Sequence, residues 1–99
     1  SPEVEVTVEM AERFLVEPVY PNPFNPQAQF RFAVKQAQAV RVELFDVTGR
    51  RVQVLFAGEV AAGQMQRVEI DGRGLPSGVY LVRLAGRDLV QTQTITLLK

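Results

Sequence analysis

The chain has 99 residues, of which 46% are hydrophobic, and its 11 basic side chains balance its 11 acidic ones. A single domain of this size buries roughly 60–65% of its unfolded surface, so we expect it to fold without disulfides or metal. Because the chain contains no cysteine and no histidine, thiolate chemistry is excluded, and the commonest metal ligand and the commonest general base are missing.

The first 17 residues differ from the rest in charge. They carry five glutamates and one arginine, a net charge of −4, so residues 18–99 carry +4. We therefore expect residues 1–17 to be an acidic linker or an extra edge strand, and residues 18–99 to be the folded domain. Residues 3–10 alternate apolar and polar side chains, which fits either that strand or the tail of a preceding domain. Since Ser1 rather than methionine opens the chain, we expect a piece of a longer protein.

A short edge strand is predicted from Phe14 to Val19, where Pro18 excludes a central position in a sheet. A proline-rich heptad follows, and it consists of Tyr20, Pro21, Asn22, Pro23, Phe24, Asn25 and Pro26. Each proline fixes φ at about −65°, removes an amide donor and keeps the preceding residue out of the α region. We expect a stiff, extended or turning segment whose asparagines bond nearby backbone and whose phenylalanine anchors it in the core. The alternative is a polyproline ligand for an aromatic groove, but the phenylalanine favours packing within the chain.

From Gln29 onward, apolar and polar residues alternate with a period of two, which predicts half-buried strands. Eight residues are expected to point into one core, namely Phe30, Phe32, Val42, Leu44, Val54, Val68, Tyr80 and Val82. Asp46 to Gly49 has the composition of a type I turn in which Gly49 supplies a positive φ, so the flanking strands should form an antiparallel hairpin. Ala57 to Gly63 is expected to be a looser connection.

The last third of the chain predicts a wide corner and two more strands. Gly and Pro residues punctuate Asp71 to Gly78, with Leu75 as a plug beneath the corner and Gly78 at a position that needs positive φ or close approach. Strands are expected from Val79 to Leu84 and from Leu89 to Leu98. About seven short strands without helical periodicity indicate an all-β fold, an immunoglobulin-like antiparallel β-sandwich.

Tyr80, just after the corner, leaves two interpretations open. Its hydroxyl can bond back to the corner backbone, as in the tyrosine corner of immunoglobulin-like domains. Alternatively it is a core tyrosine with an exposed hydroxyl.

The sequence excludes most catalytic and ligand-binding chemistry. Serine occurs only at Ser1 and Ser77, and without histidine no conventional nucleophile–base pair forms, so we expect no enzyme activity. Asp46, Asp71 and Asp88 fall in predicted turns, where aspartate bonds backbone, whereas calcium needs six to eight oxygens. We expect no metal or cofactor, no nucleic-acid partner, since the basic residues do not cluster, and no direct membrane span, since no apolar run approaches ~20 residues.

Four segments occur in a characteristic order: YPNPFNP from Tyr20, VRVELFDVTGRRV from Val40, LPSGVYLVRL from Leu75, and a closing ITLLK that ends on Lys99. Their order, spacing and terminal lysine resemble the C-terminal sorting domain, type A, of the type IX secretion system, over about four fifths of the chain. The resemblance implies a non-catalytic address label at the end of a larger secreted protein. It also implies recognition of the folded domain at the outer membrane and removal by a cell-surface sortase-like peptidase that cuts on its N-terminal side.

The resemblance assigns a sorting role to Gly78, Tyr80, Leu97, Leu98 and Lys99, and a structural role to the heptad, Asp46 and Gly49. It places the protein on the cell surface or outside the cell, reached through the periplasm. The terminal strand is expected to present a free edge, and deletion of the last three residues is expected to leave the fold stable.

Two further points bear on this interpretation. Residues 91–94 carry no lysine where the family often does, which argues against electrostatic recognition through the last strand. The rival function is an immunoglobulin-like spacer, adhesion or carbohydrate-binding module of a secreted enzyme, and that function predicts an exposed aromatic platform.

Overall fold

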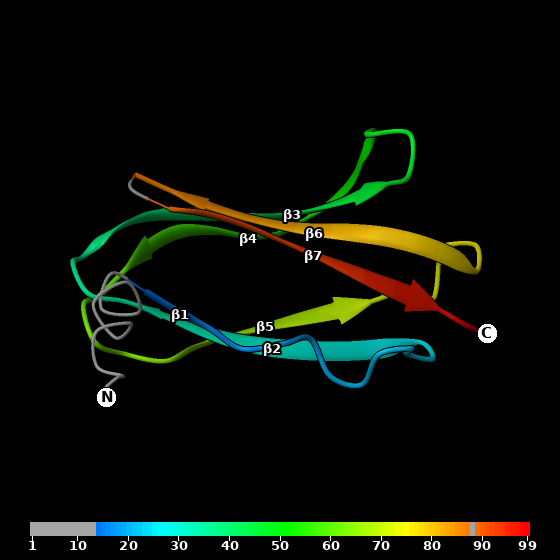
Figure 1. Cartoon of the computed structure of the whole chain (residues 1–99), viewed down its shortest axis with the longest axis horizontal. Coiled ribbons are helices and arrows are strands. Elements are labelled where there is room, and N and C mark those ends of the chain that lie inside the picture. Colours follow the sequence, from blue (N-terminus) through cyan, green and yellow to red (C-terminus); the bar gives the residue numbers. More distant parts are fainter. Residues whose placement is uncertain (1–13, 88) are drawn as a thin grey trace, which may run out of the picture.

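The structure, a computed structural model, describes residues 14–87 and 89–99, and this part of the chain contains seven strands and no helix. The strands are β1 (Phe14–Val16), β2 (Gln27–Val34), β3 (Gln38–Asp46), β4 (Arg51–Val60), β5 (Gln66–Asp71), β6 (Gly78–Gly86) and β7 (Val90–Leu97). A three-stranded sheet of order β1-β2-β5 stacks on a four-stranded sheet of order β4-β3-β6-β7, and all neighbours are antiparallel (Figure 1). The predicted immunoglobulin-like sandwich is confirmed.

The edge strand predicted before the heptad is present as β1, which pairs with β2. Beyond β1 the pairing continues irregularly, because the Glu17 amide donates to the Arg31 carbonyl at 2.9 Å. Residues 1–13 of the predicted acidic segment, including the strand expected at residues 3–10, lie outside the described residues, as does Asp88 of the turn between β6 and β7.

The core lies between the two sheets and follows the period-two pattern. Seven of the eight residues expected to point inward are buried, namely Phe30, Phe32, Val42, Leu44, Val68, Tyr80 and Val82. The Phe32 ring lies edge-on to the half-buried Phe56 ring, with 6.0 Å between the centroids. Burying one large apolar side chain contributes about 1.5–3 kcal/mol, so this layer supplies most of the driving force for folding.

Val54 is the exception, since 49% of its surface is exposed. Val42 lies opposite Phe56 but Glu43 lies opposite Val54, so β4 carries one extra residue and the alternation reverses. A second shift follows between Leu44 and Phe45. The inward prediction for Val54 was wrong because a bulge changes the side of the sheet that each following residue faces. The looser connection expected from position 57 was also wrong in part, because β4 continues to Val60.

The turn between β3 and β4 has the predicted chemistry. The Gly49 amide donates to the Asp46 carbonyl at 3.0 Å, and Gly49 has φ of 89°. Asp46 Oδ1 accepts from the Thr48 amide at 2.9 Å, from the Thr48 hydroxyl at 2.6 Å and from the Arg50 amide at 3.1 Å. The aspartate therefore organises the turn, as expected.

The positive φ of Gly49 leads to a first prediction. Gly49→Ala should lower the free energy of unfolding by at least ~1 kcal/mol, because a Cβ is strained in this backbone region even where space is free. Urea denaturation would measure the change, with Gly74→Ala as the control. Both glycines have no atom within 4 Å of an added Cβ, but only Gly49 has a positive φ. Equal stability of the two variants would contradict the role assigned to the backbone angle.

Candidate recognition end of the sandwich

Three segments that are far apart in sequence meet at one end of the sandwich, on the right in Figure 1. They are the heptad, the corner between β5 and β6, and the end of β7 with the two residues after it. Phe24 forms a parallel bridge with Leu97, and Gly78 lies opposite Leu97 in the β6–β7 register. The Asp46 turn reaches the same end, since Asp46 lies opposite Tyr80. The structure therefore brings together all the segments that the sequence singled out.

The heptad joins one sheet to the other. At its start, Tyr20 exchanges two backbone hydrogen bonds with Gln29 of β2, at 2.8 and 2.9 Å. Four residues later, the Phe24 amide donates to the Thr96 carbonyl and the Phe24 carbonyl accepts from the Leu98 amide, both at 2.9 Å. The Phe24 side chain is 1% exposed, which confirms that it anchors the loop in the core.

Asn22 makes contacts that the sequence did not predict. Its side-chain Nδ2 donates to the Thr94 carbonyl at 3.2 Å, and its Oδ1 accepts from the Thr96 amide at 3.0 Å. The expectation that the heptad asparagines bond nearby backbone was therefore wrong for Asn22, which bonds to a strand more than 70 residues away. A motif of local turn residues carries no signal for such a long-range partner.

The end of β7 is not a free edge, which corrects the prediction made for the terminal strand. Leu97 is fully buried in the core beside Phe24, and Leu98 is bonded through its amide. Deleting the last three residues would therefore remove a core side chain and create a cavity, which costs about 2–5 kcal/mol for a leucine. The premise of the expected stability, that the deletion removes only the end of an edge strand, was wrong, because Leu97 belongs to the core. Of these residues, Leu98 and Lys99 expose their side chains.

Gly72, in the corner, lies against both the heptad and β7. A Cβ at this position would lie 2.9 Å from one methyl carbon of Leu97 and 3.2 Å from the Phe24 ring. The Gly72 amide donates to the Pro26 carbonyl at 2.7 Å, so the backbone cannot move away without losing that bond. A second prediction is that Gly72→Ala lowers the free energy of unfolding by about 1–3 kcal/mol through overpacking.

The measurement is the urea midpoint of Gly72→Ala beside that of Gly74→Ala, whose Cβ meets no atom within 4 Å. A Gly72 variant as stable as the Gly74 variant would show that Leu97 and Phe24 can shift to make room.

Tyr80 holds the corner. Its hydroxyl donates to the Pro76 carbonyl at 2.6 Å, and the ring is buried, so the tyrosine-corner interpretation is confirmed over the exposed hydroxyl. Leu75 is half-buried against the core, as the predicted plug, and its amide donates to the Gly72 carbonyl at 3.0 Å. Gly78 has φ of 154°, in agreement with the expected positive angle.

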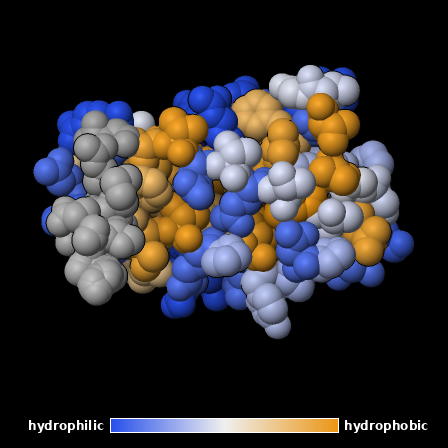
Figure 2. All heavy atoms as spheres, viewed as in Figure 1, coloured by the Kyte–Doolittle hydropathy of each residue, from blue (hydrophilic) through white to orange (hydrophobic). Residues whose placement is uncertain are grey.

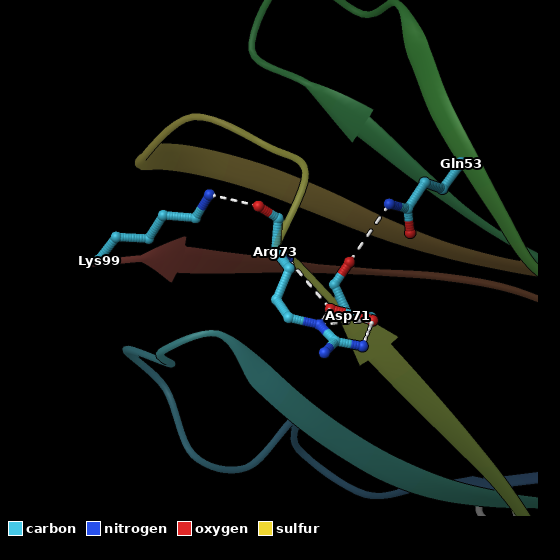
Figure 3. Close-up of polar contacts among 4 residues, drawn as sticks. All are labelled: Gln53, Asp71, Arg73 and Lys99. Atoms are coloured by element: carbon cyan, nitrogen blue, oxygen red, sulfur yellow. Dashed lines mark hydrogen bonds and ion pairs between the residues drawn. The ribbon is translucent and has the colours of Figure 1, made fainter.

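Lys99 docks on this corner (Figure 3). Its amide donates to the Ser77 hydroxyl at 3.0 Å, and its Nζ donates to the Arg73 carbonyl at 2.7 Å. Arg73 in turn pairs with Asp71 through bonds of 2.9 to 3.2 Å, and Gln53 of β4 donates to the Asp71 carbonyl at 3.3 Å. Arg73 holds the pKa of the Asp71 carboxyl below its ordinary value, and Asp71 raises the pKa of Arg73.

A third prediction follows from three lowered carboxyl pKa values. Bonds from Arg73 lower the pKa of Asp71, bonds from the Thr48 hydroxyl lower that of Asp46, and bonds from Arg51 lower that of Glu43. A carboxyl with a lower pKa in the folded state stabilises the fold above its unfolded pKa, and this stability is lost as pH falls through the folded value. The urea midpoint should therefore fall as pH decreases below about 4.

A substitution at Asp71 separates the part of the acid dependence that comes from the corner between β5 and β6. Asp71→Asn should make the midpoint less dependent on pH below about 4, because the carboxyl that must be protonated is gone. Glu59→Gln is the control, since the Glu59 side chain is exposed and makes no hydrogen bond or ion pair in the described structure. An unchanged acid profile in Asp71→Asn would remove Asp71 from the explanation.

This end of the molecule exposes apolar side chains that could form a contact surface. No group of three His, Cys, Asp or Glu side chains that could hold a metal occurs among the described residues. Three large apolar side chains are exposed near the end: Val47 at 68%, Val79 at 42% and Leu98 at 53%. Of the eight aromatic residues only Tyr20 is exposed, so the aromatic platform expected of a carbohydrate-binding module is missing. On the side shown in Figure 2, polar and hydrophobic residues are interspersed.

The fold and this end together define an immunoglobulin-like β-sandwich domain whose last strand is bound by residues 17–24. Comparison with known proteins identifies the family. The chain belongs to the secretion system C-terminal sorting domain family, which it matches over residues 18–97. This confirms the resemblance to type IX sorting domains, and a role in sorting for secretion follows from it.

A solved structure has the same fold. The chain resembles part of the crystal structure of dimeric latent PorU from Porphyromonas gingivalis, with a TM-score of 0.67 and 22% identity. The similarity covers 86% of this chain but only 9% of the PorU chain. No curated protein matches the chain. In the described residues, no helix is long and apolar enough to cross a membrane.

Proposed function

We propose that this domain is the address label of a longer secreted protein and that the type IX machinery at the outer membrane reads it in its folded form. The observation that carries the proposal is the meeting of the heptad, the β5–β6 corner and Leu97 to Lys99 at one end of the sandwich. Phe24, Leu97 and Tyr80 are buried and therefore shape this end, whereas Leu98 and Lys99 expose the side chains that a partner can touch.

The order of the C-terminal end lowers the entropic cost of binding for a partner that recognises it. The Lys99 amide and Nζ are both bonded to the corner, so the end of the chain lies in one place rather than sampling many. A partner that binds an ordered surface does not have to order it first, which saves about 0.5–1.5 kcal/mol for each immobilised side chain. Leu98, together with the exposed Val79 on the neighbouring strand, supplies apolar contact area beside the lysine.

The proposal includes removal of the domain by a sortase-like peptidase that cuts on its N-terminal side and transfers the cargo to a cell-surface anchor. β1 pairs with β2, and the Glu17 amide is bonded to Arg31. A cut before Phe14 would leave every described strand in place, whereas a cut after it would remove an edge strand. The domain itself would be non-catalytic, and its partners would be the export machinery, the peptidase and the cargo domain that precedes it.

The test is export of an inert reporter fused to the N-terminus of this chain, in a host that has the type IX system. Because deletion of three residues would damage the core, the informative variant is Leu98→Ala with Lys99→Ala, which changes exposed side chains. We expect loss of reporter from the surface and the medium and an almost unchanged melting temperature, since surface substitutions usually alter stability by no more than about 0.5 kcal/mol.

The matched control is Val90→Ala with Arg87→Ala, an exposed apolar residue and an exposed cation at the other end of β7. This control should export normally. Normal export of the Leu98 and Lys99 variant as well would remove the terminus from the recognition surface and would favour the spacer-module function.

A further inference from the structure

The outer edge of β7 is covered by the chain's own N-terminal segment. β7 is the last strand of the four-stranded sheet, so no strand formed by the described residues pairs with it on its outer side. Residues 17–24 run along this side instead. They make six hydrogen bonds with residues 93–98, and all six join groups more than 70 residues apart in sequence.

Four of the six bonds come from two side-chain amides. Gln93 Oε1 accepts from the Val19 amide at 2.9 Å, and its Nε2 donates to the Glu17 carbonyl at 3.0 Å. Asn22 likewise uses both its donor and its acceptor, on Thr94 and Thr96. A carboxamide has the same donor and acceptor as a peptide unit, so Asn22 takes the place that a neighbouring strand would occupy.

The sequence of β7 explains why its edge needs a cover. Residues 90–98 read VQTQTITLL, nine residues without charge, proline or glycine and rich in β-branched side chains. Segments of this composition pair readily with copies of themselves when an edge is open. Natural sheets protect their edges with charges, bulges, short strands or a covering loop.

The three other edges of this sandwich carry such protection within the strand. β1 has only three residues, β5 carries Arg67, Glu69 and Asp71, and β4 carries charged residues and two register shifts. Only β7, among the edge strands described, combines length with a complete absence of charge.

We propose that residues 17–24 are an edge guard, which keeps β7 from pairing with the same strand of a second copy of this domain. The buried Phe24 side chain holds this segment against the core, and the side-chain amides of Asn22 and Gln93 make the hydrogen bonds that cover the edge of β7. The inference does not depend on the sorting function, because it concerns the isolated chain.

The experiment removes the side-chain hydrogen bonds that cover the edge of β7 and keeps the buried Phe24 side chain. The double substitution Asn22→Ala with Gln93→Ala, called the seal variant below, deletes four of the six bonds and leaves Phe24 in place. The matched control is Asn25→Ala with Gln91→Ala: Asn25 also precedes a proline of the heptad, Gln91 also lies on β7, and neither side chain forms a hydrogen bond in the described structure. Light scattering after size exclusion would measure mass over a range of concentrations, and hydrogen exchange would report on the Thr96 amide.

We expect the wild type and the control to remain monomeric, and the seal variant to form dimers or larger species as its concentration rises. The Thr96 amide should exchange roughly tenfold faster in the seal variant, because it loses its acceptor. Adding Thr94→Lys to the seal variant should restore the monomer, since a charge on an exposed edge opposes pairing. If circular dichroism shows that the double variant is unfolded, Asn22→Ala alone is measured in the same way.

Three results would overturn the proposal. In the first, the wild type already associates through β7. In the second, the folded seal variant stays monomeric although its Thr96 amide exchanges faster. In the third, the seal variant associates and Thr94→Lys does not restore the monomer. Unchanged exchange of Thr96 in a folded variant would also show that Asn22 does not cover the strand.

Discussion

Burial of the Phe24 ring is the constraint on which this end of the molecule depends. Removing the apolar Phe24 ring from water favours the docked loop by about 1.5–3 kcal/mol. Docking requires the room that Gly72 leaves, and it brings the Phe24 backbone into hydrogen-bonding register with Thr96 and Leu98. Once those bonds form, Leu97 is enclosed between the loop and the corner.

The start and the end of the domain are therefore bonded directly to each other. Gln93 contacts Glu17 and Val19, and Asn22 contacts Thr94 and Thr96. Contacts of such high sequence separation form only when most of the chain has folded, because closing a long loop costs entropy that local bonds cannot offset. Lys99 itself bonds to Ser77 and Arg73 of the corner, but the strand that leads to it is held by these long-range contacts, so a partner that binds this end would contact the folded domain.

The sequence was sufficient for the features that depend on local chemistry. Period-two alternation predicted the strands and seven inward residues, the Asp46 to Gly49 composition predicted the turn, and the position of Tyr80 after a Pro-Gly corner made its hydroxyl bond one of two expected outcomes. The errors arose where a residue's environment is set by distant parts of the chain. The bulge that exposes Val54 depends on how β4 pairs with β3, and alternation alone does not reveal where an extra residue is accommodated.

The covered edge of β7 is the most instructive of these errors. The last strand of a chain was expected to be open, and an uncharged Thr- and Gln-rich strand gave no reason to doubt it. The partner of that edge is a loop whose side-chain amides imitate a strand, and no period or turn motif encodes such pairing. The same property makes the arrangement effective, because a neutral strand can accept a closely packed loop without desolvating a charge. Charged side chains on β7 would protect its edge without the loop. They would also place charges beside the buried Phe24 and Leu97, at the end of the sandwich where the heptad joins the two sheets.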